Sequence, residues 1–259
     1  MNASQGGRRL EPARDRCPAV IWHDLECGSY AADLPLWREL AARAGTEGTA
    51  EPVLDVGAGT GRVALDLARR GHLVTALDLD AELLAALQER ASGLPVETVR
   101  ADARSFELDG RGFGLCIAPM QTVQLLGGPA GRIAFLGRAR AHLRPGGILA
   151  CAIVTAFEPF DCAAGDAGPS AETARLDDVL YSSRATRVSV RLDAILIERE
   201  RRIVSPVEAT SERNVVELAC VGESQLRREG IEAGLTPLPS RSVDPTYEHI
   251  GSAVVMFHA

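Results

Sequence analysis

The chain has 259 residues, 46% of them hydrophobic, and a formal net charge of −7 at pH 7. This size and composition allow one substantial hydrophobic core, whereas the negative charge gives no long-range attraction to a phosphate backbone, so we do not expect a nucleic-acid substrate. All 28 basic residues are arginines, which excludes enzymes that depend on a P-loop lysine, a lysine Schiff base or a lysine general base.

The spacing of cysteines and histidines gives no sign of a metal or redox centre. The six cysteines are scattered without a C-x-x-C pair, and the five histidines lack paired metal-ligand spacing. Residues 1–18 are polar, rich in Gly, Arg, Pro and Asp, and contain no apolar run. We expect a disordered tail there rather than a signal peptide or anchor, and hence a soluble cytoplasmic protein that needs no metal and no membrane.

The first helical pattern begins at Asp33, which we predict as the N-cap, and Pro35 suits the first turn. Apolar strands then alternate with amphipathic helices, which predicts a parallel sheet covered by helices. Residues 144–147, Arg-Pro-Gly-Gly, read as a turn. The expected strands are 52–56, 73–77, 96–100, 113–118 and 148–155, and the expected helices are 61–70, one capped by Asp80 and one that starts at Pro129.

Beyond Phe157 this alternation stops. Residues 159–170 read as a loop, and three strand-like stretches follow near 185–192, 194–204 and 213–221. The first of them alternates apolar and polar residues, as is typical of a sheet with one solvent-exposed face. A helix over 223–233 and strands near 235–243 and 251–258 complete the chain.

These elements predict a Rossmann-like, doubly wound α/β fold. Its seven-stranded, mostly parallel sheet would carry an inserted antiparallel sheet of three strands. We expect three parts, namely a tail over 1–18, a core formed by 19–158 and 222–259, and the insertion over 159–221.

A glycine-rich turn follows the first strand of the predicted core. Residues 53–62 read Val-Leu-Asp-Val-Gly-Ala-Gly-Thr-Gly-Arg, with glycines at three alternate positions. Glycine is needed there because the turn is tight and a side chain would block a ligand that lies against the backbone. Asp78 ends the second strand, where a carboxylate can accept hydrogen bonds from both hydroxyls of a ribose, and Asp102 follows the third strand.

This arrangement resembles the class I S-adenosylmethionine-dependent methyltransferases, whose first motif is acid-x-G-x-G-x-G. Nicotinamide-binding Rossmann proteins space their glycines differently, as G-x-G-x-x-G. The resemblance covers residues 53–155 and implies S-adenosylmethionine as cofactor, with S-adenosylhomocysteine as its product. It implies that Asp55 and the turn hold the methionine part, Asp78 the ribose, and Asp102 the adenine amino group. The expected cofactor-binding residues are Tyr30, Asp55, Gly57, Ala58, Gly59, Thr60, Gly61, Asp78, Leu79, Asp102, Ala103 and Met120.

Residues after the fourth strand should face the transferred methyl group, because ligands of open α/β sheets lie beyond the carboxyl ends of the strands. Met120 is expected as an apolar wall, and Gln121 either orients a polar acceptor or packs in the loop. The candidates for a general base are His249, with Tyr247 and Glu248, and His23, with Tyr30. The alternative for His249 is an ordinary turn residue or a packed side chain.

The resemblance extends to two further segments. Residues 30–37 resemble the N-terminal helix that small-molecule members fold over the cofactor, which implies that Tyr30 touches the methionine end. The insertion resembles their lid, which covers the acceptor and often contributes to a dimer contact. Its arginines then either meet an anionic acceptor or form a solvated strand face. These arginines are Arg187, Arg191, Arg199, Arg201 and Arg202.

The sequence therefore predicts an enzyme that moves a methyl group from S-adenosylmethionine to nitrogen or oxygen of a small metabolite, as a monomer or as a homodimer through the lid. Its expected catalytic residues are His249, Gln121 and Tyr30. Two alternatives remain. One keeps the cofactor but methylates carbon or uses the sulfonium for another reaction, and the other is a non-catalytic binding protein on the same fold.

Overall fold

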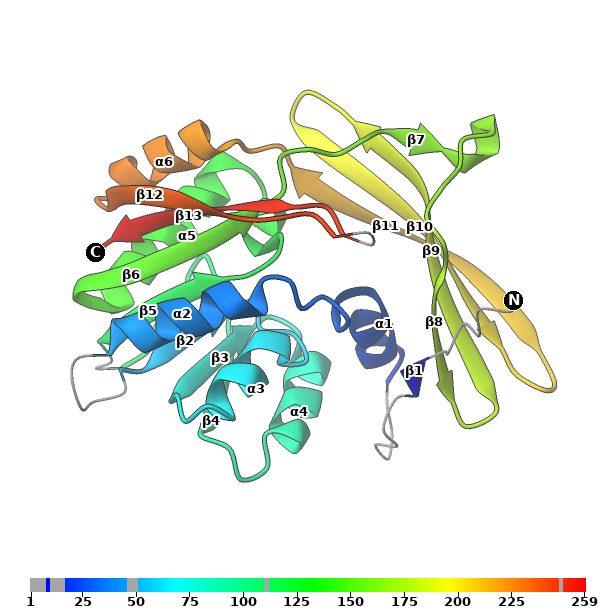
Figure 1. Ribbon diagram of the computed structural model, residues 1–259, viewed down its shortest axis with the longest axis horizontal. Coiled ribbons are helices and arrows are strands. Elements are labelled where there is room, and N and C mark those ends of the chain that lie inside the picture. Colours follow the sequence, from blue (N-terminus) through cyan, green and yellow to red (C-terminus); the bar gives the residue numbers. More distant parts are fainter. Residues whose placement is uncertain (1–7, 10–16, 46–50, 110–111, 247–248) are drawn as a thin grey trace. The chain divides into compact units, whose positions relative to one another are not determined.

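The computed structural model of the protein describes residues 8–9, 17–45, 51–109, 112–246 and 249–259 (Figure 1). The chain divides into two compact units. The smaller unit comprises Met1–Ser29 and Phe157–Glu217, and the core unit comprises Tyr30–Ala156 and Leu218–Ala259. This division places residues 19–29 in the smaller unit, whereas the sequence analysis grouped them with the core. Most of the predicted tail, residues 1–7 and 10–16, lies outside the described residues.

The core unit is built on a seven-stranded sheet with the strand order β12-β13-β6-β5-β2-β3-β4. Strands β2 to β6 run parallel to one another, whereas β13 is antiparallel to β6 and β12 is antiparallel to β13. The predicted Rossmann-like sheet is thereby confirmed. Its strands are β2 (Val53–Val56), β3 (Val74–Asp78), β4 (Val96–Arg100), β5 (Phe113–Ala118), β6 (Leu143–Ile153), β12 (Thr236–Val243) and β13 (Ser252–His258).

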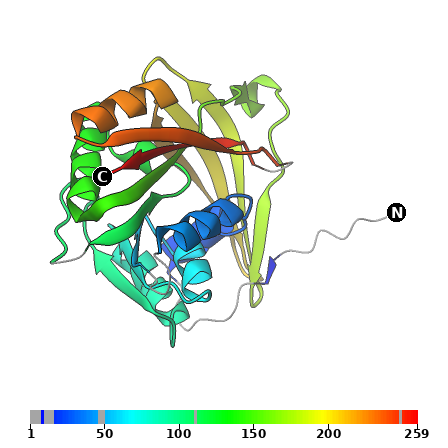
Figure 2. The same cartoon turned by 60° about the vertical axis from the view of Figure 1, so that its left-hand side comes forward.

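Helices cover both faces of this sheet because successive residues of a buried strand point to opposite sides. Leu115 and Ile117 of β5 join the apolar cluster under α2, α3 and α4, whereas Cys116 and Ala118 join the cluster under α5 and α6. Figure 2 shows α5 and α6 together on one side of the sheet and α2 on the other. The helices are α2 (Leu34–Ala44), α3 (Arg62–Ala68), α4 (Ala81–Arg90), the 3-10 turn η1 (Thr122–Leu125), α5 (Pro129–His142) and α6 (Glu223–Glu232).

The expected turn at 144–147 lies inside a strand. Strand β6 begins at Leu143, which pairs with Phe113, and the register shifts before Leu115 pairs with Ile148. Gly146 has a φ of +74° within this irregular segment. The sequence analysis began this strand at residue 148, which was wrong, because the strand already starts at Leu143 and a bulge places a turn-like glycine inside it.

The smaller unit holds an additional sheet of six strands in the order β1-β8-β9-β10-β11, with β7 paired to β9. The prediction of an additional antiparallel sheet is confirmed, but the predicted number of three strands was too low. Strand β8 has the sequence Glu-Thr-Ala-Arg-Leu, which is too short and too polar to give a periodic signal, and β7 has only two residues. The elements are β1 (Arg8–Arg9), α1 (Pro18–Cys27), β7 (Phe160–Asp161), η2 (Cys162–Ala164), β8 (Glu172–Leu176), β9 (Val179–Val190), β10 (Ala194–Val204) and β11 (Ala209–Ala219).

Helix α1 packs on this second sheet through Trp22 and Leu25, which bury against Ala174 and Tyr181. The rings of Trp22 and Tyr181 meet edge to face with 5.6 Å between their centroids. None of the helices in the described ranges is both long enough and apolar enough to cross a lipid bilayer.

Candidate active site

The turn between β2 and α3 needs glycine for two separate reasons. Gly57, Gly59 and Gly61 have φ values of +73°, +54° and +94°, a region that residues with a side chain rarely adopt. In addition, a Cβ at Gly57 would lie 2.6 Å from the Thr122 Oγ1, and one at Gly61 would overlap the Leu87 side chain. The backbone conformation and the close neighbours therefore both require glycine in this tight turn.

Hydrogen bonds hold this turn against the end of the neighbouring strand. The backbone N–H groups of Gly57 and Ala58 both donate to the Leu77 carbonyl, at 2.8 and 3.1 Å, and the Gly61 N–H donates to the Ala58 carbonyl at 2.9 Å. Ala58 and Thr60 are buried in the turn. The path of the backbone is thus fixed by β3 as well as by its own glycines.

Asp78, the last residue of β3, joins the glycine turn to the start of α4. Its Oδ2 accepts a hydrogen bond from the Gly59 backbone N–H at 2.8 Å, and its Oδ1 accepts one from the Asp80 backbone N–H at 2.9 Å. A carboxylate oxygen can accept two hydrogen bonds, so each oxygen of this half-buried side chain retains acceptor capacity toward a ligand.

The two residues that follow Asp78 differ in role: Leu79 exposes an apolar side chain, and Asp80 caps α4. The Asp80 side chain accepts hydrogen bonds from the backbone N–H groups of Glu82 and Leu83, at 2.8 and 3.2 Å, which confirms it as the N-cap of α4. Leu79 lies between the two acids and is 61% exposed. A large apolar side chain thus lies in solvent directly beside Asp78.

Asp55 is a fully buried acid in the middle of the site. Within the described part of the chain, neither of its carboxylate oxygens has a hydrogen-bond partner of normal geometry. Its pKa is raised to about 7, chiefly by burial and also by the nearby carboxylates of Asp78 and Asp33, while the Arg62 guanidinium and the Ala64 backbone N–H lower it. A buried acceptor of this kind calls for a donor or a positive charge.

Asp102 already has a strong partner, which sequence reasoning did not find. The Arg104 guanidinium donates to both of its carboxylate oxygens, with a shortest distance of 2.6 Å, and the Arg104 backbone N–H donates at 2.8 Å. These bonds, the side-chain one first, lower the pKa of Asp102 to about 2. The signal in the sequence was an arginine two residues after the acid. Ala103, between them, is half-buried at the edge of the apolar cluster under α5.

The segment after β5 passes next to the glycine turn. Met120 adopts a φ of +55°, a conformation that is costly for a residue with a side chain and that gathers at functional sites. The Thr122 hydroxyl donates to the Pro119 carbonyl at 2.9 Å, which holds its side chain close to Gly57. Gln121 is half-buried, and its backbone carbonyl accepts the Gln124 N–H at 2.8 Å.

Gln124 is a buried polar residue that the sequence analysis missed. Its Nε2 donates to the carbonyls of Val154 and Ala219, both at 3.2 Å, and its Oε1 accepts the Val154 N–H at 2.9 Å. The amide thus ties η1 to the chain that leaves β6 and to the chain that enters α6. It supports the loop that carries Met120 and Gln121 and lies away from solvent itself.

The structure brings Tyr30 and His249 together, although the sequence analysis placed them in separate candidate pairs. Their ring centroids are 4.9 Å apart, and the His249 backbone N–H donates a hydrogen bond to the Thr246 hydroxyl at 3.0 Å. Burial and the Asp33 carboxylate raise the pKa of Tyr30, whereas a hydrogen bond with Ser252 and the charge of Arg62 lower it. Tyr247 and Glu248, named with His249 as candidates, lie outside the described residues.

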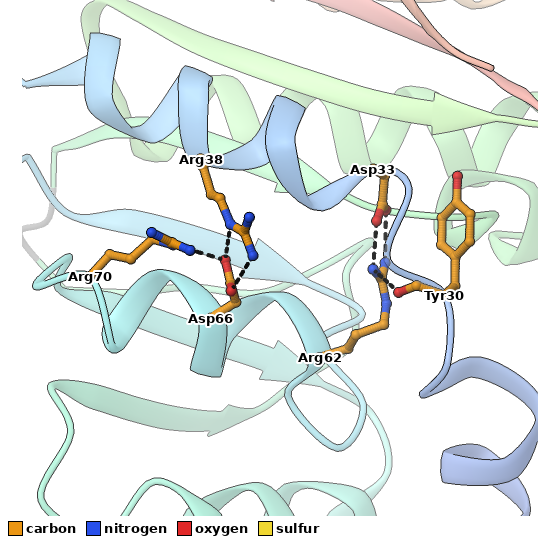
Figure 3. Close-up of polar contacts among 6 residues, drawn as sticks. All are labelled: Tyr30, Asp33, Arg38, Arg62, Asp66 and Arg70. Atoms are coloured by element: carbon orange, nitrogen blue, oxygen red, sulfur yellow. Dashed lines mark hydrogen bonds and ion pairs between the residues drawn. The ribbon is translucent and has the colours of Figure 1, made fainter. Parts of the chain in front are cut away.

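Asp33 occupies the N-cap position of α2, but its side chain makes no capping hydrogen bond, so the prediction of a capping role was wrong. Its carboxylate instead binds the Arg62 guanidinium through two hydrogen bonds of 2.6 and 2.8 Å, and it accepts the Trp37 Nε1–H at 2.8 Å (Figure 3). A charged donor outside the helix is a better partner for a buried carboxylate than the backbone N–H groups of the first turn.

Three of the arginines proposed for an anionic acceptor pair with carboxylates inside the smaller unit. Arg201 binds Glu26 through two hydrogen bonds of 2.8 Å, and its guanidinium lies 5.2 Å from the centre of the Trp22 ring. Arg199 pairs with Glu172 at 3.3 Å, and Arg187 with Asp161 at 3.4 Å. In the ranges that the structure describes, no group of three or more His, Cys, Asp or Glu side chains is placed to hold a metal ion.

Sequence comparison relates part of this chain to methyltransferases. Residues 53–147 match the family model of a methyltransferase domain. An uncharacterized methyltransferase of Mycobacterium tuberculosis is 42% identical over 66 residues, which are 26% of this chain and 34% of that protein. Ribosomal RNA small subunit methyltransferase A of Moorella thermoacetica is 35% identical over 104 residues, 40% of this chain and 35% of that protein. The matched segment thus spans about one third of the length of these relatives.

Structural comparison extends the likeness to the whole chain. The sugar N-methyltransferase KedS8 from Streptoalloteichus has a TM-score of 0.72 at 17% identity, with both chains covered completely. CalS10, an amino pentose methyltransferase of Micromonospora echinaspora solved with S-adenosylmethionine bound, has a TM-score of 0.68 at 20% identity over 96% of this chain and 100% of that one. DesVI of Streptomyces venezuelae has a TM-score of 0.67 at 19% identity over 91% and 94%. At these identities the likeness establishes the fold.

Proposed function

We propose that this chain, which has the class I methyltransferase fold and matches a methyltransferase domain over residues 53–147, transfers a methyl group from S-adenosylmethionine to nitrogen or oxygen of a small-molecule metabolite. S-adenosylhomocysteine would be the second product. Both the use of this cofactor and the class of acceptor are parts of the proposal.

The observation that carries the proposal is the position of Asp78 between the Gly59 and Asp80 backbone N–H groups. These two bonds fix the carboxylate at the end of β3, beside a turn with glycine at three of its positions. The remaining acceptor capacity of the two oxygens suits a pair of donors on adjacent carbons, which is what the 2′- and 3′-hydroxyls of a ribose provide. Leu79 and Ala103 then supply apolar surface for the adenine ring.

The charge around Asp55 supports a cofactor that carries positive groups. The carboxylates of Asp33, Asp55 and Asp78 act on one another, and Arg62 is the guanidinium that opposes them at Asp55. Because Arg62 is bound to Asp33, the site keeps an excess of negative charge that favours an ammonium or sulfonium group. The buried oxygens of Asp55, for which the described residues supply no hydrogen-bond partner of normal geometry, support this assignment of the methionine end.

The adenine end fits with one adjustment. Asp102 was expected to bind the adenine amino group through its carboxylate, and that carboxylate is already bound to Arg104. A carboxylate oxygen has more than one acceptor site, so Asp102 can serve both partners, at the expense of a weaker bond to each. We therefore assign the larger share of cofactor binding to Asp78.

The bound cofactor supplies an activated methyl group on a sulfonium, which is a good leaving group. The task of the protein is then to align the acceptor and exclude water. Met120 forms an apolar wall, Gln121 orients a polar acceptor, and the Tyr30–His249 pair is the candidate for accepting a proton if the acceptor must lose one. His23 remains an untested alternative base.

The comparisons favour an amine acceptor on a sugar-like molecule. Two structural neighbours are a sugar N-methyltransferase and an amino pentose methyltransferase, the latter involved in calicheamicin biosynthesis. We place this chain in the same general chemistry, as a tailoring step of secondary metabolism. The ribosomal RNA methyltransferase relative points to a different acceptor, which the net charge of −7 disfavours.

Calorimetric titration with S-adenosylmethionine and S-adenosylhomocysteine tests the cofactor. Absence of binding of either at millimolar concentration would refute both enzymatic readings and leave a non-catalytic protein on this fold. Mass spectrometry after incubation with methyl-labelled cofactor and a panel of amino sugars, simple amines, phenols, acids and a ribosomal RNA fragment then tests the acceptor. Label on carbon would favour the C-methyltransferase alternative, and label on a ribosomal RNA fragment would refute the small-molecule assignment.

A further inference from the structure

Two ion pairs connect α2 and its N-terminal end to α3, and they differ in their surroundings (Figure 3). Arg38 of α2 binds Asp66 of α3 through two hydrogen bonds of 2.8 and 2.7 Å, and their side chains are 34% and 19% exposed. Asp33 binds Arg62 with similar geometry, but these side chains are only 2% and 10% exposed. The second pair is thus the buried counterpart of the first.

Arg62 is the residue directly after the glycine turn, and it makes three hydrogen bonds within the protein. One terminal nitrogen donates to the Asp33 carboxylate and to the Tyr30 backbone carbonyl, at 2.6 and 2.9 Å, and the other donates to Asp33 at 2.8 Å. Its guanidinium carbon also lies 5.1 Å from the centre of the Tyr30 ring. Because these contacts hold its guanidinium against Asp33 and Tyr30, we expect Arg62 to influence a ligand through those residues.

The partner of Arg62 is held rigidly. Trp37 is completely buried, and its Nε1–H donates to Asp33 at 2.8 Å, so the carboxylate is fixed from the side of α2 as well. Arg62 therefore links Asp33, which directly precedes α2, to the residue that follows the glycine turn. The Tyr30 ring contacts both Arg62 and His249.

Arg62 also supplies a positive charge that lowers the pKa of Asp55 and so favours its ionised form. The groups that act on Asp55 are the guanidinium of Arg62, the carboxylates of Asp78 and Asp33 and the Ala64 backbone N–H, and the Asp55 charge in turn raises the pKa of the Cys116 thiol on the adjacent strand. Removal of Arg62 would leave three neighbouring acids without this cation.

We propose that Arg62 is a positioning residue for the methyl donor, because it holds Tyr30 in place at the glycine turn and offsets the negative charge of Asp55. The proposal rests on the proposed use of S-adenosylmethionine. It assigns no direct contact between Arg62 and the cofactor. It predicts that loss of Arg62 damages binding more than loss of the matched pair Arg38–Asp66, although both losses remove an ion pair between the same segments.

The test compares Arg62→Met with Arg38→Met in titrations of the purified full chain with S-adenosylmethionine. We expect affinity to fall about 30-fold in Arg62→Met, as when a buried charge loses its partner, and to change less than about twofold in Arg38→Met, where the pair is exposed. Arg62→Lys, which keeps the charge but loses the planar fork, should recover part of the affinity. Thermal unfolding without ligand verifies that each variant is folded.

The pH profile separates positioning from a general loss of stability. Without Arg62 the pKa of Asp55 rises, so the pH at which cofactor affinity changes should move upward in Arg62→Met and stay unchanged in Arg38→Met. Equal losses of affinity in the two variants, or an unchanged pH profile in Arg62→Met, would overturn the proposal while the wild type still binds the cofactor.

A second readout needs no cofactor. Nitration of tyrosine by tetranitromethane, followed residue by residue with peptide mass spectrometry, reports how well Tyr30 is protected in the unliganded chain. Tyr30 is buried, so we expect its nitration to be at least about fivefold faster in Arg62→Met than in the wild type or in Arg38→Met. Unchanged protection would refute the positioning role of Arg62. Failure of the wild type to bind S-adenosylmethionine would instead refute the proposed function.

Discussion

The Gly59 backbone N–H donates a 2.8 Å hydrogen bond to the Asp78 carboxylate, and this bond connects the turn after β2 to the end of the adjacent strand β3. Gly59 follows β2 and Asp78 ends β3, nineteen residues further along the chain. A bond from a backbone N–H to a carboxylate is charge-assisted and directional. It fixes the acid at the place where a ribose would lie.

Asp78→Ala should weaken binding of S-adenosylmethionine 10- to 100-fold, or about 1.4–2.7 kcal/mol, because the ribose hydroxyls lose their acceptor. Calorimetry measures the affinity. Asp80→Ala is the matched control, since it removes a carboxylate two residues away that caps α4. It should cost about 1 kcal/mol of folding stability and leave the affinity nearly unchanged. Unchanged affinity in Asp78→Ala would show that the ribose lies elsewhere.

Gly57→Ala should destabilise the core unit by about 3 kcal/mol or more, because the methyl group combines a φ of +73° with a 2.6 Å approach to Thr122. Gly71→Ala is the control. That glycine has a φ of +89° but no neighbouring atom within 4 Å, so only the backbone term remains, about 1–2 kcal/mol. Urea unfolding of both variants measures the difference. Similar losses would mean that the Thr122 contact relaxes freely.

Asp55→Asn should change how stability depends on pH. The folded state raises the pKa of Asp55 from 3.8 to about 7, so between these values the folded chain binds more protons than the unfolded chain, and stability falls as pH rises. Asparagine cannot ionise. The stability of Asp55→Asn relative to the wild type should therefore increase from pH 4 to pH 7, by up to about 4 kcal/mol. Denaturant titrations at both pH values measure it, and parallel curves would contradict a raised pKa.

Two substitutions of His249 distinguish a role as proton acceptor from a role as a packed aromatic ring. His249→Phe keeps an aromatic ring against Tyr30 and removes the imidazole, whereas His249→Ala removes both. If His249 is the general base, both variants should lose about 100-fold in turnover and show a different rate profile between pH 6 and 9. The measurement uses the acceptor found by mass spectrometry. Normal turnover in His249→Phe with a loss in His249→Ala would assign His249 to packing.

Local sequence patterns predicted most of the core unit. Strands β4 and β5 and the start of α5 lie where the apolar runs and Pro129 placed them, and Asp80 is the cap that its position predicted. These features depend on residues close together in the chain, such as the alternation of a strand or a carboxylate beside free N–H groups. For the same reason the three glycines were read correctly as a tight turn.

Residues whose roles depend on distant partners were missed or misread. Asp33 satisfies the local rule for a cap, but it binds Arg62, which lies 29 positions away. Gln124 reads as an ordinary loop residue until Val154 and Ala219 surround its amide. Arg104 differs in kind, since it lies only two positions from Asp102 and its pairing was available to local reasoning.

The sequence by itself determined the class of fold, the glycine turn and the acids at successive strand ends, because periodicity and turn chemistry are properties of neighbouring residues. Only the tertiary structure decided which acid is bound by the turn and which has buried oxygens without a hydrogen-bond partner among the described residues. Asp78 and Asp55 look alike in the sequence, and their differences arise from the burial and the groups that folding brings to them from other parts of the chain.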